Sequence, residues 1–179
     1  MVEAFFRSTF LAWKDYHNSS QEIAYVGYSP NICVDAEAIF ADFPQAKIIH
    51  VVRNPYSAYA DTKKRPVPYS LLKYIDIWNM VQLYAVNLAH LYPKNFFLVK
   101  FENLVASPKK LFTRLTKKLG LKYSPALEYP SWNGTKIETV VPWGTIKTPT
   151  SSSNQNTRGE LTQQEQAQIK ARTHHINKI

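Results

Sequence analysis

The sequence has one cysteine, Cys33, among its 179 residues. A single cysteine excludes an internal disulfide framework, and no spacing of Cys and His matches a structural zinc site. We expect Cys33 to be a small residue of the core. No apolar run approaches the ~20 residues that span a bilayer, and the N-terminal stretch lacks a signal-peptide cleavage pattern. A cytoplasmic location is therefore the default expectation.

Glycine and acidic residues are also scarce. The chain has 5 glycines, the first of which is Gly27, so the N-terminal part contains no glycine-rich loop. Only 13 acidic residues stand against 22 basic ones, which gives a formal net charge of +9. This excess favours an anionic partner such as a nucleotide, a sulfated ligand, nucleic acid or a membrane surface. A basic surface that serves solubility alone is the alternative.

The length and the 45% hydrophobic content fit one globular domain over residues 1–179. Apolar runs predict strands at residues 23–27, 47–52 and 96–101. Helical periodicity, proline and glycine predict helices at residues 2–17, 31–41, from 55 to before Pro66, 69–91, 108–119 and 161–175. Strands that are apolar throughout and alternate with helices indicate an α/β fold, with a parallel sheet covered by helices on both faces. Ligands of such sheets bind at the carboxyl ends of the strands.

Arg53 lies at the carboxyl end of the second predicted strand. Asn54 can cap the helix that follows, and Pro55 suits its first turn. The guanidinium and the unpaired N–H groups of the helix could then face one volume, and both favour a phosphate. In the alternative interpretation Arg53 forms a salt bridge with Asp42 or Asp61 and only fastens the helix to the sheet.

Several segments, in the same order, resemble one family. The segment FPQAKIIHVVRNPYSAYAD resembles the central segment of sulfotransferases that use 3′-phosphoadenosine 5′-phosphosulfate (PAPS). Trp78, the segment FFLVKFENLVASP and the tripeptide LGL at residues 119–121 follow as in that family. WNGTKIETVVPWGTIKT, residues 132–148, is similar to a loop that leads to the nucleotide in some bacterial members. The resemblance covers most of the chain from about Tyr25 onward.

The resemblance implies a three-layer α/β/α fold of the P-loop type and transfer of a sulfuryl group from PAPS to an acceptor hydroxyl. The acceptor would be a carbohydrate or a small molecule, the product 3′,5′-diphosphoadenosine, and no metal is required. No nucleic-acid or membrane partner is implied. The catalytic residues, the acceptor and the oligomeric state are not assigned.

Residue by residue, the resemblance assigns Arg53 to the 3′-phosphate of PAPS. The serine that the family usually has eight positions later is Asp61 here, and a carboxylate would repel the phosphate. Ser57, one helical turn after Arg53, is a candidate for the missing donor. Phe101 stands where the family often has a tyrosine near the adenine.

The other candidate donors lie in a predicted nucleotide-binding loop over residues 143–159. This loop contains Gly144, Lys147, Ser151 and Arg158. Its part from Thr145 to Thr157 is rich in Ser, Thr and Asn, a composition that by itself favours a mobile surface loop over a loop that becomes ordered on a ligand.

Two features of the family are missing. The segment that often carries a lysine and a general-base histidine corresponds to residues 26–30, which contain neither, and Tyr28 is expected to be a pocket wall. No loop that would cradle the 5′-phosphosulfate precedes Tyr25. We therefore expect the chain to lack, or to have lost by degeneration, the N-terminal portion of the family's domain. The absence of a signal peptide then says little about the full-length protein.

Other polar residues have structural interpretations as well as functional ones. His50 lies inside a strand and is expected to be a core histidine with its hydrogen bonds satisfied. Glu102 and Asp76 could act as general bases only if the fold brings them to the acceptor. A basic stretch is either an exposed helix face or a patch for a polyanion; it comprises Lys109, Lys110, Arg114, Lys117 and Lys118.

Three functions follow from these observations. The leading hypothesis is a PAPS-dependent sulfotransferase domain. The second is a non-catalytic or truncated sulfotransferase-like domain that still binds the nucleotide, which the missing features favour. The third is a basic nucleic-acid-binding protein, although the sequence has no RNA-binding aromatic motif and no zinc finger.

Overall fold

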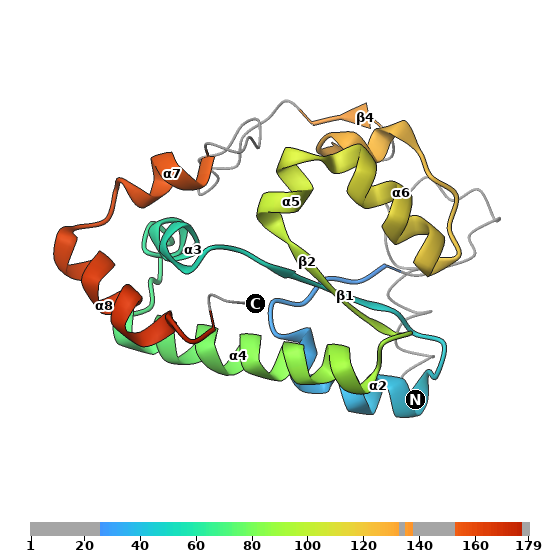
Figure 1. Ribbon diagram of the computed structural model, residues 1–179, viewed down its shortest axis with the longest axis horizontal. Helices are drawn as coiled ribbons and strands as arrows, with labels where there is room; N and C mark the ends of the chain where they lie inside the picture. The colour runs from blue at the N-terminus through green and yellow to red at the C-terminus, as the bar shows by residue number, and fades with distance from the viewer. Residues whose placement is uncertain (1–25, 133–134, 138–152, 177–179) are drawn as a thin grey trace.

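The computed structural model describes residues 26–132, 135–137 and 153–176 (Figure 1). The described elements are η1 (Ile32–Asp35), α2 (Ala36–Asp42), β1 (Ile48–Val52), α3 (Pro55–Thr62), α4 (Leu71–Leu91), β2 (Phe96–Lys100), α5 (Phe101–Ala106), α6 (Pro108–Leu119), η2 (Pro125–Glu128), β3 (Ser131–Trp132), β4 (Thr135–Lys136), α7 (Ser153–Arg158) and α8 (Gln163–Thr173). The helix predicted over residues 2–17 lies outside the described residues. Of the strand predicted at 23–27, only Val26 and Gly27 are described, and neither is in a strand.

The two longer strands, β1 and β2, form a parallel pair. Ile48 lies opposite Phe96 and Val52 lies opposite Lys100. The Ile48 N–H donates to the Asn95 carbonyl at 2.8 Å, which sets this register. The chain returns from β1 to β2 through α3 and α4, the helical crossover that parallel strands require. The described part of the chain is thus a mixed α/β structure with a two-stranded parallel sheet.

The long helix α4 covers one face of the sheet. Its buried side chains recur three and four positions apart, from Tyr74 and Ile75 to Ala85 and Leu88, and so form one stripe. The C-terminal half of this stripe packs with Ile48 and Phe96 of the strands. Cys33, fully buried as expected, belongs to the same cluster. In Figure 1, α4 and α2 lie below the strands and α5 and α6 lie above them.

The opposite face of the sheet is covered only in part. Phe97 and Val99 of β2 pack against Leu115 of α6. On β1, however, Ile49 and Val51 are 41% and 49% exposed. The expected three-layer arrangement is therefore present around β2, whereas the described residues cover β1 on one face. The expectation that both strands would be buried on both faces was wrong for β1.

Several predicted boundaries need correction. The strand predicted at 96–101 ends at Lys100, because Phe101 already begins α5. Asn31 precedes a 3₁₀ helix and its side chain makes no capping hydrogen bond. Gly120 does end α6, and its φ of 70° is the left-handed conformation that glycine adopts without strain. Helices α5 and α7 and the short pair β3 and β4 were not predicted.

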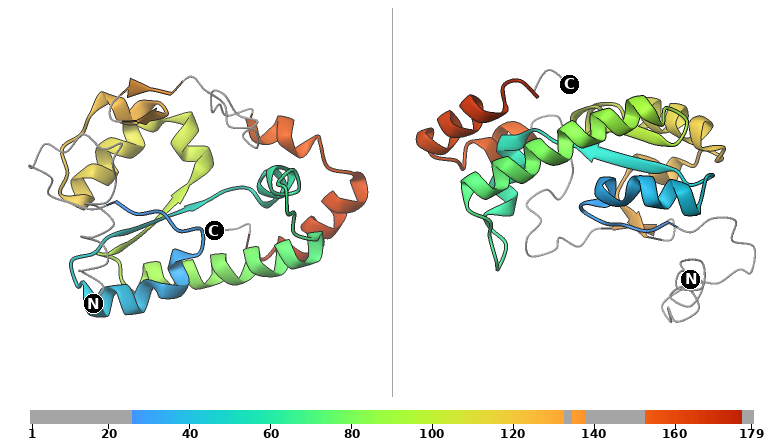
Figure 2. Two further views of the ribbon diagram at one scale, coloured as in Figure 1. Left: turned by 180° about the vertical axis from the view of Figure 1, so that it is seen from behind. Right: turned by 90° about the horizontal axis from the view of Figure 1, so that it is seen from below.

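The C-terminal helix closes a second core at the other end of α4. Leu161, Ile169 and Ile176 pack with aromatic side chains of α3 and α4. As Figure 2 shows from behind, α7 and α8 lie beside α3, at the end of the molecule opposite α6. Within the described ranges, no helix has both the length and the apolar character that crossing a bilayer demands.

His50 is a buried residue of β1, as its position in the sequence predicts. Its Nε2 lies 3.0 Å from Oε1 of Gln82 on α4, and its exposed fraction is 8%. Burial lowers the pKa of His50 below its ordinary value of 6.5, although the hydrogen bond to Gln82 opposes this shift. The folded protein therefore favours the neutral imidazole.

We predict that His50 makes the protein less stable in mild acid. Below pH 6.5 the unfolded chain binds a proton at His50 that the folded chain resists, so the free energy of unfolding decreases as the pH falls from about 7 to about 5. Urea unfolding of His50→Gln should show a weaker pH dependence over this range, and His90→Gln, at an exposed position of α4, should behave like the wild type. Equal pH dependence in wild type and His50→Gln would contradict this assignment.

Candidate functional site

The candidate site begins where β1 becomes α3. Asn54 is the N-cap of α3, and its Oδ1 accepts a hydrogen bond from the Tyr56 N–H at 3.0 Å. Pro55 occupies the first turn, where its missing N–H costs no hydrogen bond. The cap and the proline predicted from the sequence are both confirmed. Arg53 thus leaves the sheet at the start of a helix.

Glu102 fixes this turn from the neighbouring strand. Its Oε1 accepts a hydrogen bond from the Asn54 backbone N–H at 3.0 Å. Glu102 lies in the first turn of α5, directly after β2. Because β1 and β2 end at the same edge of the sheet, a carboxylate from one strand end can hold the backbone at the other. Glu102 therefore acts on the position of Arg53 through Asn54.

Arg53 is surrounded by groups that suit a guanidinium. Its Nη1 forms an ion pair with Asp61 Oδ2, and its Nη2 lies 3.5 Å from the hydroxyl of Thr157. The guanidinium carbon stands 4.9 Å from the centroid of the Phe101 ring, within cation–π range. The side chain is 18% exposed. The salt bridge with Asp61 is the alternative that the sequence left open, and Asp42 has no part in it.

Helix α7 brings two further polar residues to α3. Thr157 is 4% exposed and faces Arg53. Arg158 places its guanidinium 4.4 Å from the centroid of the Tyr56 ring, and its Nε donates to Gln166 Oε1 at 3.1 Å. The end of the predicted nucleotide-binding loop thus lies against the helix that starts at Arg53.

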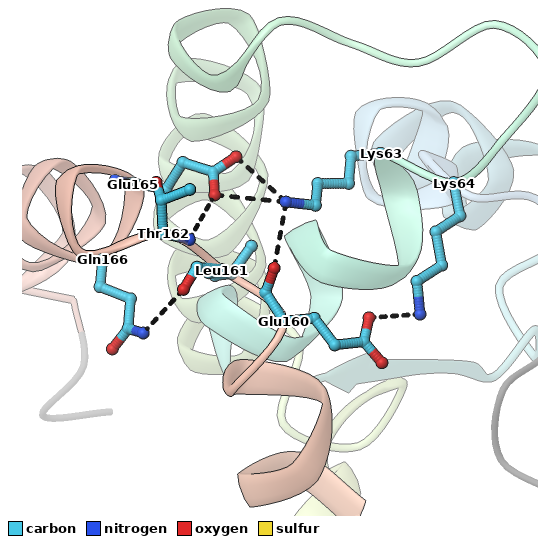
Figure 3. Close-up of polar contacts among 7 residues, drawn as sticks. All are labelled: Lys63, Lys64, Glu160, Leu161, Thr162, Glu165 and Gln166. Atoms are coloured by element: carbon cyan, nitrogen blue, oxygen red, sulfur yellow. Dashed lines mark hydrogen bonds and ion pairs between the residues drawn. The ribbon is translucent and has the colours of Figure 1, made fainter.

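A set of polar contacts holds α7 and α8 against the end of α3 (Figure 3). The Lys63 ammonium donates to both carboxylate oxygens of Glu165 at 3.2 Å and to the Glu160 carbonyl at 3.3 Å. Lys64 forms an ion pair with the Glu160 side chain. Thr162 and Glu165 form a capping box that starts α8, a motif with hydrogen bonds in both directions. These contacts connect α3 to the segment that carries Thr157.

A cavity of about 240 Å³ opens beside Arg53. Residues of the β1–α3 turn, Lys100 and Glu102 line one part of it, and Trp78 and Gln82 of α4 line another. Ligand pockets usually measure about 300–1,000 Å³. The described residues therefore enclose space for one part of a nucleotide, such as a phosphate or a ring, beside two cations.

The structure brings together three of the predicted site residues, Arg53, Asp61 and Phe101. Ser57 is 0% exposed, so its hydroxyl faces the interior of the protein. Arg158 lies on α7, as described. Gly144, Lys147 and Ser151 lie outside the described residues.

Other expectations about this region change. Tyr28 is 90% exposed and lines neither of the two described cavities, so its expected place in a pocket wall was wrong. Asp76 is exposed on α4 and lines neither cavity, whereas Glu102 lines the cavity beside Arg53. Thr157 belongs to the predicted loop 143–159, but its contact with Arg53 was not predicted, because the two residues are 104 positions apart.

The comparison with protein families agrees with this geometry. Residues 1–125 match the sulfotransferase family. The chain belongs to the sulfotransferase family. The match includes the residues before Tyr25, in addition to the segments that carry the resemblance, and ends before the segment 132–148. No curated protein and no solved structure has a significant match to the chain. Membership of the sulfotransferase family implies the P-loop type of fold and a reaction between a sulfuryl donor and an acceptor.

We predict that Asn54 stabilises α3 through its side-chain acceptor. Asn54→Ala removes the cap and should lower the free energy of unfolding by about 1 kcal/mol. Asn54→Asp keeps an acceptor at the same position and should stay near the wild-type value. Urea unfolding followed by circular dichroism measures both variants. Equal losses in the two variants would show that the side-chain cap does not stabilise this turn.

Proposed function

We propose that this chain is a PAPS-dependent sulfotransferase domain, which transfers a sulfuryl group to a hydroxyl of a carbohydrate or small-molecule acceptor. The observation that carries the proposal is the place of Arg53, at the carboxyl end of a parallel strand, at the start of α3 and beside a cavity. Family membership supports the reaction class. The proposed product of the donor is 3′,5′-diphosphoadenosine.

The residues around Arg53 fit the 3′-phosphate of the donor. A guanidinium offers several N–H donors in a plane, so Arg53 can keep its contact with Asp61 and still donate to a phosphate oxygen. Lys100 adds a second cation to the cavity lining. The Phe101 ring, which already packs on Arg53, would lie next to the adenine. PAPS itself supplies the activated sulfuryl group, and these residues would bind and orient it.

The loop over residues 143–159 is the proposed second part of the nucleotide site. Its end is described, and there Thr157 reaches Arg53 while Arg158 lies over Tyr56. These contacts favour a nucleotide-binding role for Arg158 and, because they belong to the same loop, for Gly144 and Lys147. Ser57 would take part only if its buried hydroxyl became accessible.

One observation favours the second candidate function, a sulfotransferase-like domain that binds the nucleotide without catalysis. Asp61 forms an ion pair with Arg53, at the position where the family usually has a serine. The carboxylate offsets the charge that would attract the phosphate, so nucleotide binding is weakened without being abolished. Incubation with radiolabelled PAPS and a panel of hydroxyl acceptors separates the two functions, because only a sulfotransferase moves the label to an acceptor.

We predict that Arg53 gives the protein its preference for 3′-phosphorylated adenosine. Isothermal titration should show tighter binding of 3′,5′-diphosphoadenosine than of AMP to the wild type. Arg53→Ala should weaken binding of the diphosphate by about 10- to 100-fold, because charge-assisted hydrogen bonds are lost, and change AMP binding little. Arg172→Ala removes an exposed arginine of α8 and is the matched control. Equal, weak binding of both nucleotides by the wild type would refute the donor assignment.

Replacement of Asp61 should have the opposite effect on the affinity for the nucleotide. We predict that Asp61→Ser increases the affinity for 3′,5′-diphosphoadenosine by about 3- to 10-fold, since the substitution removes a carboxylate next to the proposed phosphate position. Asp76→Asn removes one negative charge at an exposed site of α4 and should leave the affinity within about twofold. The measurement is the same titration at fixed ionic strength. Weaker binding by Asp61→Ser would mean that the ion pair is needed to hold Arg53 in its binding orientation.

A further inference from the structure

A second and larger cavity runs along β2 and shares Val52, Leu98 and Lys100 with the cavity beside Arg53. It measures about 750 Å³, and all residues of the strand from Phe96 to Lys100 line it. It also touches Ala89 of α4 and Leu111 of α6. These two helices lie on opposite faces of the sheet, so the cavity must pass around the edge of β2 that faces away from β1. We call it the β2 groove.

The edge of β2 in this groove presents backbone hydrogen-bonding groups. The Asn95 carbonyl accepts from the Ile48 N–H, so the alternate residues Phe97 and Val99 direct their backbone groups toward β1. The backbone N–H and C=O of Leu98 and the N–H of Lys100 are therefore directed to the opposite edge of β2. Among the described residues, no strand pairs with β2 on that side. Such an edge is a template for an added strand.

The side of the groove formed by α6 is strongly cationic. Lys110, Arg114 and Lys118 line it, Lys100 of β2 also lines the groove, and the lining contains no carboxylate. The three α6 residues are exposed, and the ion pairs of the described residues do not involve them. The Lys118 ammonium lies 5.8 Å from the centroid of the Phe97 ring, which connects this row of charges directly to the strand.

The spacing of the cations matches an extended peptide. Lys110, Arg114 and Lys118 are four residues apart, so they follow one another at about 6 Å along α6. Alternate residues of a β-strand point to the same side and are about 6.6 Å apart. Acidic side chains at every second position of an added strand could therefore each meet one cation. Nucleic acid is the weaker fit, since the aromatic residues that line the groove, Phe96 and Phe97, are buried and offer no surface for stacking bases.

We propose that the β2 groove binds an extended acidic segment of a partner protein, which adds a strand to β2 and places its carboxylates on α6. The backbone of the peptide would bond to Leu98 and Lys100. Its apolar side chains would point to the opposite face of the sheet, where Leu98 of β2 and Ala89 of α4 line the groove. The proposal does not depend on nucleotide binding or on sulfuryl transfer.

The test uses the full chain and a fluorescein-labelled peptide of about seven residues, the length of an ordinary strand, which alternates Glu with Val. Fluorescence polarisation should detect binding that weakens as salt is added. Lys110→Gln with Lys118→Gln should weaken binding by about tenfold. The matched control is Lys109→Gln with Lys117→Gln, which removes the same charge from the same helix outside the groove lining and should change the affinity less than twofold.

A second peptide tests the added strand separately from the charges. Methylation of alternate backbone nitrogens on the edge that faces β2 removes donors and keeps every carboxylate, so it should weaken binding by about tenfold. Arg53→Ala should leave peptide binding unchanged, which separates this result from the donor site. The proposal is overturned if the wild type does not bind the peptide, if methylation has no effect, or if the two double variants lose affinity equally. Tighter binding of a heparin oligosaccharide or an oligothymidylate of equal charge would overturn it in favour of a general polyanion groove.

Discussion

The parallel register of β1 and β2 is the constraint on which the Arg53 site and the β2 groove both depend. Because Val52 lies opposite Lys100, the two strands end at the same level of the sheet. Arg53 follows β1 and Phe101 follows β2, and the contact between these two residues results from that register. Glu102, one residue further, reaches the Asn54 N–H for the same reason. A shift of the register by one residue would separate all of these groups and turn each side chain of the strand to the other face.

The ion pair between Arg53 and Asp61 has two opposing effects on an anion site. It holds the guanidinium in one orientation at low exposure, which lowers the entropy that a ligand would have to remove. It also places a negative charge where a phosphate would approach. In water these effects would be small, but the pair is about four-fifths buried, so the field of the carboxylate is less screened. In the proposed donor site, the residue at position 61 therefore affects how strongly Arg53 attracts the phosphate.

The parts of the fold that follow local rules could be predicted from the sequence. The β1 strand, the Asn54 cap, Pro55 and the left-handed Gly120 each depend on a few neighbouring residues, and the structure has all four. The interactions of Glu102 and Thr157 could not be predicted, because their partners are 48 and 104 residues away. The prediction that Tyr28 lies in a pocket wall was wrong for a related reason. Its role was assigned by spacing within a motif, and spacing alone does not determine whether a side chain reaches a cavity.

The same separation of local and distant causes applies to charge. Five cations of the basic stretch on α6 are evident in the sequence, but their positions alone do not distinguish a solvated face from a binding surface. The structure divides them: Lys110, Arg114 and Lys118 line the β2 groove, whereas Lys109 and Lys117 do not. Lys100 lies where the two cavities meet, since both include it in their lining. The two cavities thus have cations of different origin: Arg53 follows the carboxyl end of β1, and Lys110, Arg114 and Lys118 of α6 lie along the open edge of β2.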